Sequence, residues 1–381
     1  MKIFLVVRGY PSEKDPQWGT FERDQAIALK QLGHEVVVIS VDGRFKIKNK
    51  YGFAFRKADD IHIYNLFIGP YGLSRFLSYK LYDKIGEKLM FFLFKKVISL
   101  EGKPDVIYAH YLNNIISALA IKKTFKTPIV GIEHWSEFGK QNPAKSAINR
   151  AKKAYPKLDK LLSVSNFLKR NINKNINIES IILPNMLNKS FYFHKNRNSN
   201  KPFRFVTAGN LIPIKNINLI LKAFKEISNE FDIHLDIAGD GILKKKLEKY
   251  CIDNNLYNVT FHGRLNTSAL SDLFNQCDSY IISSNSETFG VSALEAMACG
   301  LPVIATDCGG PSEFINESNG ILIPVNNVDK MKDAIIEMIK NIDKYDRQNI
   351  SKEVIEKFSS EKIGKQLNEI FQKTLEEFKK K

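Results

Sequence analysis

Short apolar runs alternate with longer amphipathic stretches along the whole chain. An apolar run at residues 3–7 precedes a helical stretch at 20–32, which Gly33 closes as a helix stop, and the next apolar run begins at residue 36. This strand–helix–strand rhythm predicts a parallel sheet that is covered by helices. In the first half of the chain we expect strands at residues 3–7, 36–41, 105–109, 129–132 and 160–164.

The rhythm restarts after a polar segment. Residues 194–202 read HKNRNSNKP and hold no apolar residue before Pro202, which is typical of a linker. We therefore predict two Rossmann-like α/β domains, at 1–195 and 196–360, followed by an amphipathic helix at 361–381. In the second domain we expect strands at residues 203–208, 234–238, 259–262, 280–283, 302–305 and 320–323, with helices at 216–231, 242–254, 269–275, 291–299 and 329–342.

Composition excludes several classes of protein. The 26 Phe and 14 Tyr among 381 residues supply enough apolar surface to rule out a disordered chain. The longest apolar run, at residues 89–94, is far shorter than the roughly 20 residues that span a bilayer, and the run at 3–7 is too short for a signal peptide. Four cysteines without a C-x-x-C pair or a histidine cluster indicate free thiols in a reducing compartment and no metal site. These features predict a cytoplasmic protein.

Charge is distributed unevenly between the two halves. Residues 1–195 hold 33 Lys and Arg against 16 Asp and Glu, a net charge of +17, whereas residues 196–381 hold 24 and 25, a net charge of −1. A one-sided positive field favours an anionic partner, such as nucleic acid, an anionic lipid surface or a phosphorylated substrate. The alternative is a chain that simply uses lysine heavily.

The densest chemical pattern follows the strand expected at 280–283. The sequence SNSETFGVSALEAMACGLP begins at Ser284, forms a polar loop and enters a helix near Gly290. A helix N-terminus binds anions through its free N–H groups and its dipole. Glu287 stands just before the helix and Glu295 two turns inside it, and carboxylates accept hydrogen bonds from the hydroxyls of a sugar or a ribose. Alternatively, Glu287 complements the helix dipole and Glu295 is a solvated helix residue.

Other strand ends carry further candidates, because ligands bind at the carboxyl ends of parallel strands. Lys215 sits at a loop-to-helix junction, where an ammonium can hold a diphosphate, or where a lysine is simply exposed near a turn. His110 and the pair Glu133 and His134 end two neighbouring strands, although a lone histidine is more often structural. Gly19 opens a helix after the first strand and permits close backbone approach to a ligand.

The sequence SNSETFGVSALEAMACGLPVIATDCGGPSEFI, in this two-domain context, resembles the retaining glycosyltransferases of family 4, which have the GT-B fold. WGTFERDQAIALKQLGHEVVVIS is similar to the family's first βαβ unit, and DVIYAH, SVSNFLKR, ILPN, AGDGILKKKLE and VTFHGRL follow in the family's order. The resemblance covers nearly the whole chain. It implies a UDP- or GDP-sugar donor held mainly by the second domain and a glycan or glycolipid acceptor held mainly by the first, across a cleft. It also implies no cofactor, no metal ion and no nucleic-acid partner.

The resemblance assigns the donor site to particular residues. Glu287 would bind hydroxyls of the donor sugar as a catalytic residue, Glu295 would bind the ribose, and Lys215 would hold the diphosphate. Many family members have Arg where this chain has Asn210, and that Arg normally helps to neutralise the diphosphate. Arg264 is a candidate substitute for that charge. Lys215 would be joined at the diphosphate by the backbone amides of Phe289, Gly290 and Val291.

The first domain would contribute the remaining site residues. His110 would touch the transferred sugar near the reacting centre, and Gly19 would help at the diphosphate. Glu133 and His134 fall where the family often has a Thr-x-His segment on the acceptor side, and Asn185 would lie near the domain junction. The implied reaction retains the anomeric configuration, with the leaving phosphate itself deprotonating the acceptor, and serves bacterial surface-glycan synthesis. The alternatives are another GT-B enzyme, such as a nucleotide-sugar epimerase, or a catalytically idle module that binds nucleotide or another anion.

A basic and apolar segment at residues 75–100 predicts a further partner. Lys80, Lys84 and Lys88 step by four and share a helix face, and apolar residues such as Phe76 and Leu77 lie close by in sequence. Such a helix can lie in the interface of an anionic membrane, which would place the protein peripherally on the inner face of the cell membrane. The alternative is a core helix with a solvated row of lysines.

Overall fold

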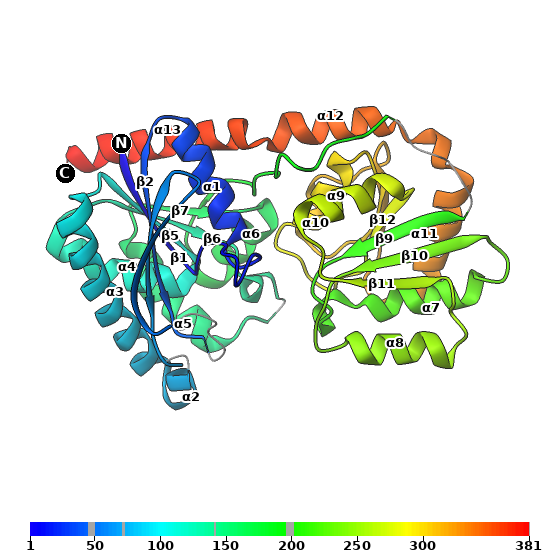
Figure 1. Ribbon diagram of the computed structural model, residues 1–381, viewed down its shortest axis with the longest axis horizontal. Helices are drawn as coiled ribbons and strands as arrows, with labels where there is room; N and C mark the ends of the chain where they lie inside the picture. Colours follow the sequence, from blue (N-terminus) through cyan, green and yellow to red (C-terminus); the bar gives the residue numbers. More distant parts are fainter. Residues whose placement is uncertain (45–49, 71–72, 141, 196–201, 381) are drawn as a thin grey trace. The chain divides into compact units, whose positions relative to one another are not determined.

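The computed structural model describes residues 1–44, 50–70, 73–140, 142–195 and 202–380. The chain forms two compact units, residues 1–186 with 360–381 and residues 187–359, and each contains one β-sheet with helices against it (Figure 1). The boundary after Met186 differs from the one expected after residue 195, because the intervening residues pack on the second unit. The Leu187 N–H donates to the Phe358 carbonyl at 2.8 Å, and the Phe191 ring lies 5.9 Å from the Phe274 ring.

The first unit is built on an eight-stranded sheet in the order β3-β4-β2-β1-β5-β6-β7-β8. Neighbouring strands pair in parallel, except that β3 and β4 form an antiparallel hairpin at one edge. The strand order reverses between β1 and β5, so their carboxyl ends form a switch point, where ligands bind in such sheets. The strands are β1 (Lys2–Val7), β2 (Glu35–Asp42), β3 (Gly52–Ala58), β4 (Ile61–Phe67), β5 (Val106–His110), β6 (Ile129–Glu133), β7 (Lys160–Ser163) and β8 (Ile181–Ile182).

The β3–β4 hairpin adds an antiparallel edge, which the sequence analysis did not predict, to the expected parallel sheet. Its turn is formed by Asp59 and Asp60, whose φ angles of 52° and 57° are the left-handed values that a two-residue type I′ turn requires. Aspartate tolerates this backbone conformation better than most residues do. Arg23 fixes the turn from the neighbouring helix with two hydrogen bonds of 2.7 Å to the Asp59 carboxylate.

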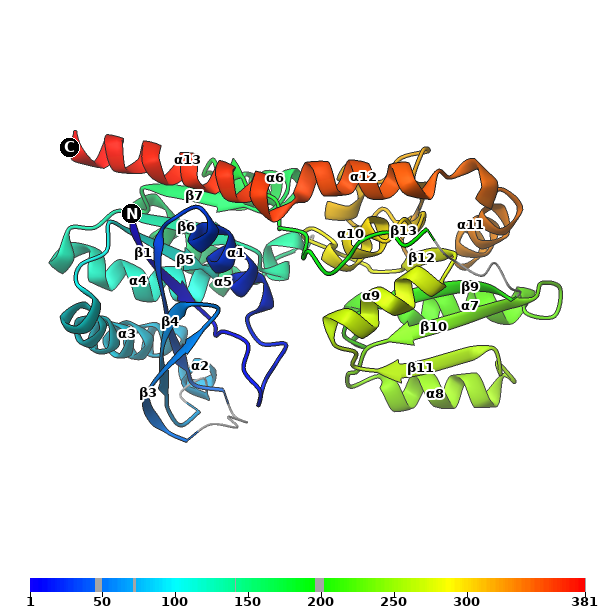
Figure 2. The same ribbon diagram turned by 45° about the horizontal axis from the view of Figure 1, so that its top comes forward.

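Helices cover both faces of this first sheet, with α1 and α13 on one side and α3 and α4 on the other (Figure 1 and Figure 2). The C-terminal helix α13 belongs to the first unit although it follows the second in sequence. Its Phe371 ring packs 5.2 Å from Tyr108, and its Asn368 Oδ1 lies 2.8 Å from His34 Nε2. The helices are α1 (Thr20–Gln31), α2 (Ser74–Leu77), α3 (Tyr79–Glu101), α4 (Tyr111–Phe125), α5 (Lys145–Ala154), α6 (Asn166–Ile176) and α13 (Ser360–Lys379).

The second unit has a six-stranded parallel sheet in the order β11-β10-β9-β12-β13-β14. The order reverses between β9 and β12, which places a second switch point at their carboxyl ends. Nowhere in the described ranges of either unit does a helix combine the length and apolar character of a membrane span. The strands are β9 (Phe203–Ala208), β10 (Ile233–Ala238), β11 (Val259–Gly263), β12 (Ser279–Ile282), β13 (Val303–Thr306) and β14 (Gly320–Ile323), and the helices are α7 (Ile217–Ile227), α8 (Lys244–Asp253), α9 (Thr267–Gln276), α10 (Val291–Ala298), α11 (Val328–Lys340) and α12 (Arg347–Phe358).

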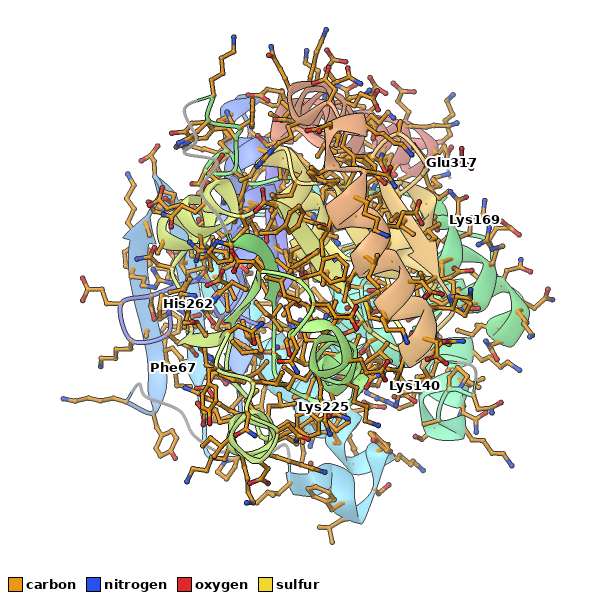
Figure 3. The ribbon with its side chains drawn as sticks, turned by 90° about the vertical axis from the view of Figure 1, so that its right-hand side faces the viewer. Phe67, Lys140, Lys169, Lys225, His262 and Glu317 are labelled. Atoms are coloured by element: carbon orange, nitrogen blue, oxygen red, sulfur yellow. The ribbon has the colours of Figure 1, made fainter. Side chains whose placement is uncertain are left out.

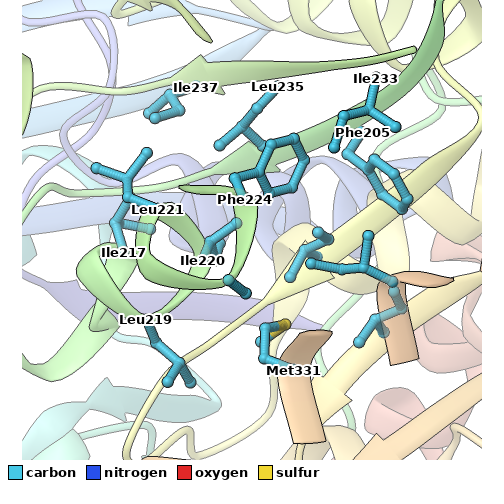
Figure 4. Close-up of a cluster of buried hydrophobic side chains, with 14 of the residues drawn as sticks. Phe205, Ile217, Leu219, Ile220, Leu221, Phe224, Ile233, Leu235, Ile237 and Met331 are labelled. Atoms are coloured by element: carbon cyan, nitrogen blue, oxygen red, sulfur yellow. The ribbon is translucent and has the colours of Figure 1, made fainter. Parts of the chain in front are cut away.

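A cluster of buried apolar side chains holds α7 and α11 against the second sheet (Figure 4). The inner face of α7 buries Ile220 and Phe224 beside Met331 of α11, whereas Lys225 on the outer face of α7 is exposed (Figure 3). Full burial of one such apolar side chain contributes about 1.5–3 kcal/mol. This core fixes both β9 and α7, and therefore both ends of the loop that carries Lys215.

Candidate functional site

The loop between β9 and α7 brings Lys215 to the switch point of the second unit. Lys215 ends a short 3₁₀ turn, and the following Asn216 adopts a left-handed conformation with φ 46°. Two bonds from the segment after β12 hold this loop: the Asn285 N–H donates to the Ile214 carbonyl at 2.8 Å, and the Ser283 hydroxyl donates to the Lys215 carbonyl at 2.9 Å. The loop that carries the Lys215 ammonium is therefore held by β9, which it follows, and by the segment after β12.

Glu287 forms an ion pair with Lys215, so the structure brings together two of the residues expected at the donor site. The Ser284 hydroxyl also donates to the same carboxylate oxygen, Oε1, at 2.7 Å. The Glu287 N–H donates to the Cys308 carbonyl and its carbonyl accepts from the Gly310 N–H, each at 2.9 Å. With its backbone held on both sides and Oε1 engaged by Lys215 and Ser284, the carboxylate has a defined position.

Helix α10 begins at Val291, four residues beyond Glu287. Its N-terminal cap, Gly290, has φ 92°, and a Cβ there would lie 2.6 Å from Pro311 Cγ, so only glycine fits. The Phe289 ring is buried and packs 5.6 Å from Phe314, which leaves only the Phe289 backbone for a ligand. The N–H groups at this end of the helix carry the positive end of its dipole. The amides of residues 289–291 thus lie in sequence and space beside Glu287.

The remaining donor-site candidates lie along the same edge of the sheet. Asn210 is exposed directly after β9, and Glu295 is half-buried on α10. Arg264 is exposed after β11, which is separated from β9 by β10. Neighbouring strands lie about 4.8 Å apart, so Arg264 starts roughly 10 Å along the edge from Asn210. A long arginine side chain can span part of that distance, but the structure records no ion pair for Arg264 within the described residues.

Burial keeps Cys299 and Cys308 of this unit in the protonated thiol form. All four cysteines of the unit are buried, and none forms a disulfide within the described residues. Burial, followed by the charge of Glu287, raises the pKa of Cys308 to about 12, and burial raises the pKa of Cys299 to about 11. A thiol with such a pKa holds little thiolate near neutral pH and is a poor nucleophile. Within the described residues no group of acidic, histidine or cysteine side chains is arranged to hold a metal ion.

In the first unit, His110 ends β5 and caps the N-terminus of α4. It is fully buried, and in the described part of the chain neither of its ring nitrogens has a hydrogen-bond partner. Its ring stacks on His134, which follows β6, with centroids 5.5 Å apart. Burial, then His134 and Arg8, hold the pKa of His110 well below 6.5, and burial followed by Arg8 lowers the pKa of His134 to about 3. Both imidazoles are therefore neutral near pH 7.

Glu133 is fully buried, and four donors within the protein converge on its carboxylate. Oε1 accepts from the N–H groups of His134 and Trp135, at 2.9 and 2.8 Å. Oε2 accepts from the Leu112 N–H at 3.0 Å and from the Tyr155 hydroxyl at 2.6 Å. Glu133 thus ties the end of β6 to the first turn of α4. We interpret it as a residue that positions His134, which differs from the substrate contact that the sequence suggests.

Gly19 is also explained by contacts within the protein. It caps α1 with φ 88°, and a Cβ at this position would lie 2.2 Å from the Gly9 carbonyl oxygen. The close approach that glycine permits here is to the chain's own backbone. The neighbouring Trp18 donates its indole N–H to the Arg8 carbonyl at 2.9 Å. The structure therefore gives Gly19 a packing role at the switch point of the first unit.

Sequence reasoning overlooked Arg8 and Tyr111 at this switch point. Arg8 follows β1 directly and bonds Glu22 Oε1 through its Nε at 2.9 Å. Its guanidinium lies 4.0 Å from the Tyr111 ring centroid. The signal was present in the sequence, because an arginine directly after a buried strand lies at the carboxyl edge of the sheet. Both residues line a cavity of about 490 Å³ within the first unit.

Two family models match the chain, Glycosyltransferase Family 4 at residues 19–190 and Glycosyl transferases group 1 at residues 188–356. An uncharacterized glycosyltransferase of Methanocaldococcus jannaschii is 30% identical over 284 residues, which are 73% of this chain and 78% of that protein. The chain belongs to the group 1 glycosyltransferases. This glycosyltransferase is also 24% identical to N-acetyl-alpha-D-glucosaminyl L-malate synthase of Bacillus anthracis, over all of this chain and 99% of that one.

Solved structures identify the fold of this glycosyltransferase as GT-B. Sucrose-phosphate synthase from Thermosynechococcus elongatus superposes with a TM-score of 0.82 at 19% identity, with 98% of each chain covered. The Anabaena protein HepE in complex with UDP-glucose gives a TM-score of 0.72 at 19% identity, with 98% of this chain and 100% of that chain covered. Both expectations, the family and two parallel-sheet α/β domains, are therefore confirmed.

Proposed function

We propose that this glycosyltransferase moves a sugar from a UDP- or GDP-sugar to a hydroxyl of a glycan and retains the anomeric configuration. The observation that carries the proposal is the Lys215–Glu287 pair at the carboxyl ends of β9 and β12, beside the N-terminus of α10. An ammonium and a helix N-terminus suit a diphosphate, and a fixed carboxylate suits sugar hydroxyls. The complex of the Anabaena protein with UDP-glucose supports a UDP-sugar.

The donor contacts follow from this pair. Lys215 and the amides of residues 289–291 hold the diphosphate, and Glu287 accepts hydrogen bonds from the sugar hydroxyls. Glu295 is proposed to bind the ribose. Asn210 is neutral, so the exposed Arg264 is proposed to supply a second positive charge to the diphosphate. These contacts stabilise the diphosphate more as its bond to the sugar breaks and its charge grows.

The transfer itself needs no covalent enzyme intermediate. The bond from the anomeric carbon to the diphosphate oxygen breaks, and the acceptor oxygen bonds to the same face of that carbon. The departing phosphate oxygen takes the acceptor proton. His110, neutral and without a partner in the described protein, is proposed to hydrogen-bond the transferred sugar, while Glu133 holds His134 in place on the acceptor side.

A panel of donors tests this function. At about 100 times its Kd, a bound nucleotide sugar stabilises the fold by about 2.7 kcal/mol, which raises Tm by several degrees. We expect a UDP- or GDP-sugar to do so, and slow hydrolysis of that donor to release the free nucleotide. Uridine and guanosine, which lack the diphosphate, serve as controls. Stabilisation without any release would favour an idle binding module, and no stabilisation by any nucleotide sugar would contradict the proposal.

We further propose that the acceptor is a lipid-linked or polysaccharide glycan of bacterial surface-glycan synthesis, reached at an anionic membrane surface. The C-terminal half of α3 is core, because Met90, Leu93, Phe94 and Val97 are buried. The segment from residue 73 to the N-terminal half of α3 is not core. Its apolar side chains are exposed, and they lie near lysines on one face of α3. Exposed residues of this basic apolar patch are Leu73, Phe76, Leu77, Lys80, Leu81, Lys84 and Lys88.

Vesicle flotation is expected to show binding to phosphatidylglycerol-containing vesicles that fades with added salt. Replacing Lys80, Lys84 and Lys88 with alanine should abolish most of it, since each basic residue at an anionic surface contributes about 1 kcal/mol. Alanine at the exposed Lys222, Lys245 and Lys246 of the second unit changes the net charge equally and serves as the control. Equal recovery from neutral and anionic vesicles, or from both triple variants, would contradict membrane docking through this patch.

A further inference from the structure

Three aromatic rings from separate parts of the second unit meet beside the loop at residues 283–290, between β12 and α10. Phe289 belongs to this loop, Phe314 follows the 3₁₀ turn Gly310–Glu313, and Phe358 ends α12. The ring centroids lie 5.6 Å apart for Phe289 and Phe314, 5.7 Å for Phe289 and Phe358, and 6.0 Å for Phe314 and Phe358. Rings at these distances attract one another. We call these three residues the three-ring cluster.

The cluster fixes the side chain of a residue whose backbone faces the donor site. Phe289 is buried, whereas Phe314 and Phe358 are half-buried. In the described part of the chain, the N–H groups of Phe289, Gly290 and Val291 have no hydrogen-bond acceptor. These three donors are therefore available to a ligand. A ring that is locked in place also limits rotation of the backbone to which it is attached.

The segment after β13 holds the same backbone by direct contact. A Cβ at Gly310 would lie 2.4 Å from Phe289 Cα and 2.5 Å from Phe289 N, so glycine lets this segment lie against the loop. The Phe314 N–H donates to the Pro311 carbonyl at 3.2 Å, which closes the turn that carries the Phe314 ring. The sequence GGPSEF at residues 309–314 therefore forms a wall for Phe289 and Gly290.

Phe358 is itself anchored through its backbone. Its carbonyl accepts from the Leu187 N–H at 2.8 Å, and Leu187 forms a parallel bridge with Ser359. Leu187 and Ser359 are the first and last residues of the second unit, so the Phe358 ring is held where two passes of the chain meet. None of the three rings carries a charge or a hydrogen-bonding group. Any effect on a bound anion must therefore pass through the Phe289 backbone.

We propose that Phe314 and Phe358 are positioning residues for the diphosphate, because they hold the amides of residues 289–291 in one orientation before the donor binds. Donors that are already oriented lose little conformational entropy when the diphosphate arrives. Without either ring, the Phe289 backbone samples further orientations that must be given up on binding. This inference rests on the proposed function, since it names residues that prepare that donor site.

The affinity of a nucleoside diphosphate relative to its nucleoside isolates this effect, because base and ribose are common to both. We expect the parent protein to bind UDP or GDP about 100-fold more tightly than uridine or guanosine. Phe358→Leu should lower this ratio by about 5- to 10-fold, because it keeps an apolar side chain but loses the ring contacts. Phe314→Leu should act in the same way. Calorimetric titration measures the diphosphates, and displacement of the diphosphate measures the nucleosides.

Two further variants separate positioning from folding. Phe358→Tyr keeps the ring at a half-buried position, where a hydroxyl can reach water, and should keep the ratio of the parent protein. Phe203→Leu is the matched control, because Phe203 is also half-buried and its ring lies 4.8 Å from that of Phe205. Phe203 begins β9, so it lies roughly 17 Å from the donor edge of the sheet. Its substitution should lower Tm as Phe358→Leu does and leave the ratio unchanged.

An unchanged ratio in a folded Phe314→Leu or Phe358→Leu variant would overturn the inference, and if one of them fails to fold, the other decides alone. An equal fall in Phe203→Leu, or in Phe358→Tyr, would also overturn it, because the rings would then serve only the fold. A parent protein that binds UDP and GDP no more tightly than uridine and guanosine would instead overturn the proposed diphosphate site, and the inference with it.

Discussion

Glu287→Gln is expected to lower kcat/KM for transfer by about 10- to 100-fold, the loss that follows when a hydrogen bond to a charged group becomes one to a neutral group. The glutamine keeps the size of the side chain and can still accept from Ser284. It loses the negative charge that pairs with Lys215 and that strengthens bonds from the sugar hydroxyls. The fall should appear mainly in kcat, because the sugar gains positive charge as it leaves the diphosphate.

The stability of this variant separates catalysis from folding. Glu287 lies in a polar loop, so Tm should change by no more than about 3 °C. Glu226→Gln is the matched control, because Glu226 pairs with Lys332 at 2.9 Å on the surface of the same unit. Like Glu287→Gln, the Glu226→Gln substitution removes the carboxylate from one ion pair with lysine, and it should leave transfer unaffected. Near-normal turnover in Glu287→Gln would show that the catalytic site lies elsewhere.

The position of Glu287 illustrates what a sequence pattern can predict. Strand ends are visible as points where an apolar run stops, and parallel strands place those ends on one edge of a sheet. Lys215 after β9 and Glu287 after β12 are each expected at that edge, and the family resemblance implies that they share a site; in the structure they form an ion pair. The adjacency of β9 and β12 comes from the structure, because the rhythm of strands and helices along the chain does not specify the order of strands in the sheet.

Side-chain roles within the first unit depended on contacts that spacing cannot reveal. Glu133 ends a strand just as His110 does, yet Tyr155, which is distant in sequence, and three backbone amides occupy its carboxylate. Gly19 precedes a helix as a ligand-binding glycine does, but it is required by the Gly9 carbonyl. In both cases at least one partner comes from another part of the chain (Leu112 and Tyr155 for Glu133, Gly9 for Gly19), so the local pattern fitted two roles equally well.

Two features of the fold lay beyond the sequence pattern for similar reasons. The hairpin of β3 and β4 depends on a turn at Asp59 and Asp60. An Asp-Asp pair does not indicate a type I′ turn from sequence as an Asn-Gly pair does. The amphipathic C-terminal helix α13 has an apolar face that must be buried, but its spacing does not say against which unit. Phe371 packs on Tyr108, so the helix belongs to the first unit.

Lys215→Ala is expected to lower kcat/KM for donor hydrolysis and for transfer by about 100-fold, as loss of a charge-assisted bond to a diphosphate predicts. Both KM and kcat should suffer, because the ammonium contacts the diphosphate before and during departure. The substitution also leaves Glu287 without its cation, beside a diphosphate of the same sign. Lys222→Ala removes an exposed lysine seven residues further along the same unit and is the control, with kinetics like those of the parent protein.

Asn210→Arg in the Lys215→Ala background tests whether Lys215 acts through its positive charge on the diphosphate. Asn210 is exposed at the carboxyl end of β9, the strand that leads into the Lys215 loop, so an arginine there can reach the same diphosphate. We expect it to restore donor hydrolysis by about tenfold, because a guanidinium binds phosphate oxygens in pairs. Steady-state release of UDP or GDP measures both variants. If Lys215→Ala keeps its activity, the diphosphate lies elsewhere; if the arginine restores nothing, Lys215 acts by orienting Glu287 rather than by its charge on the donor.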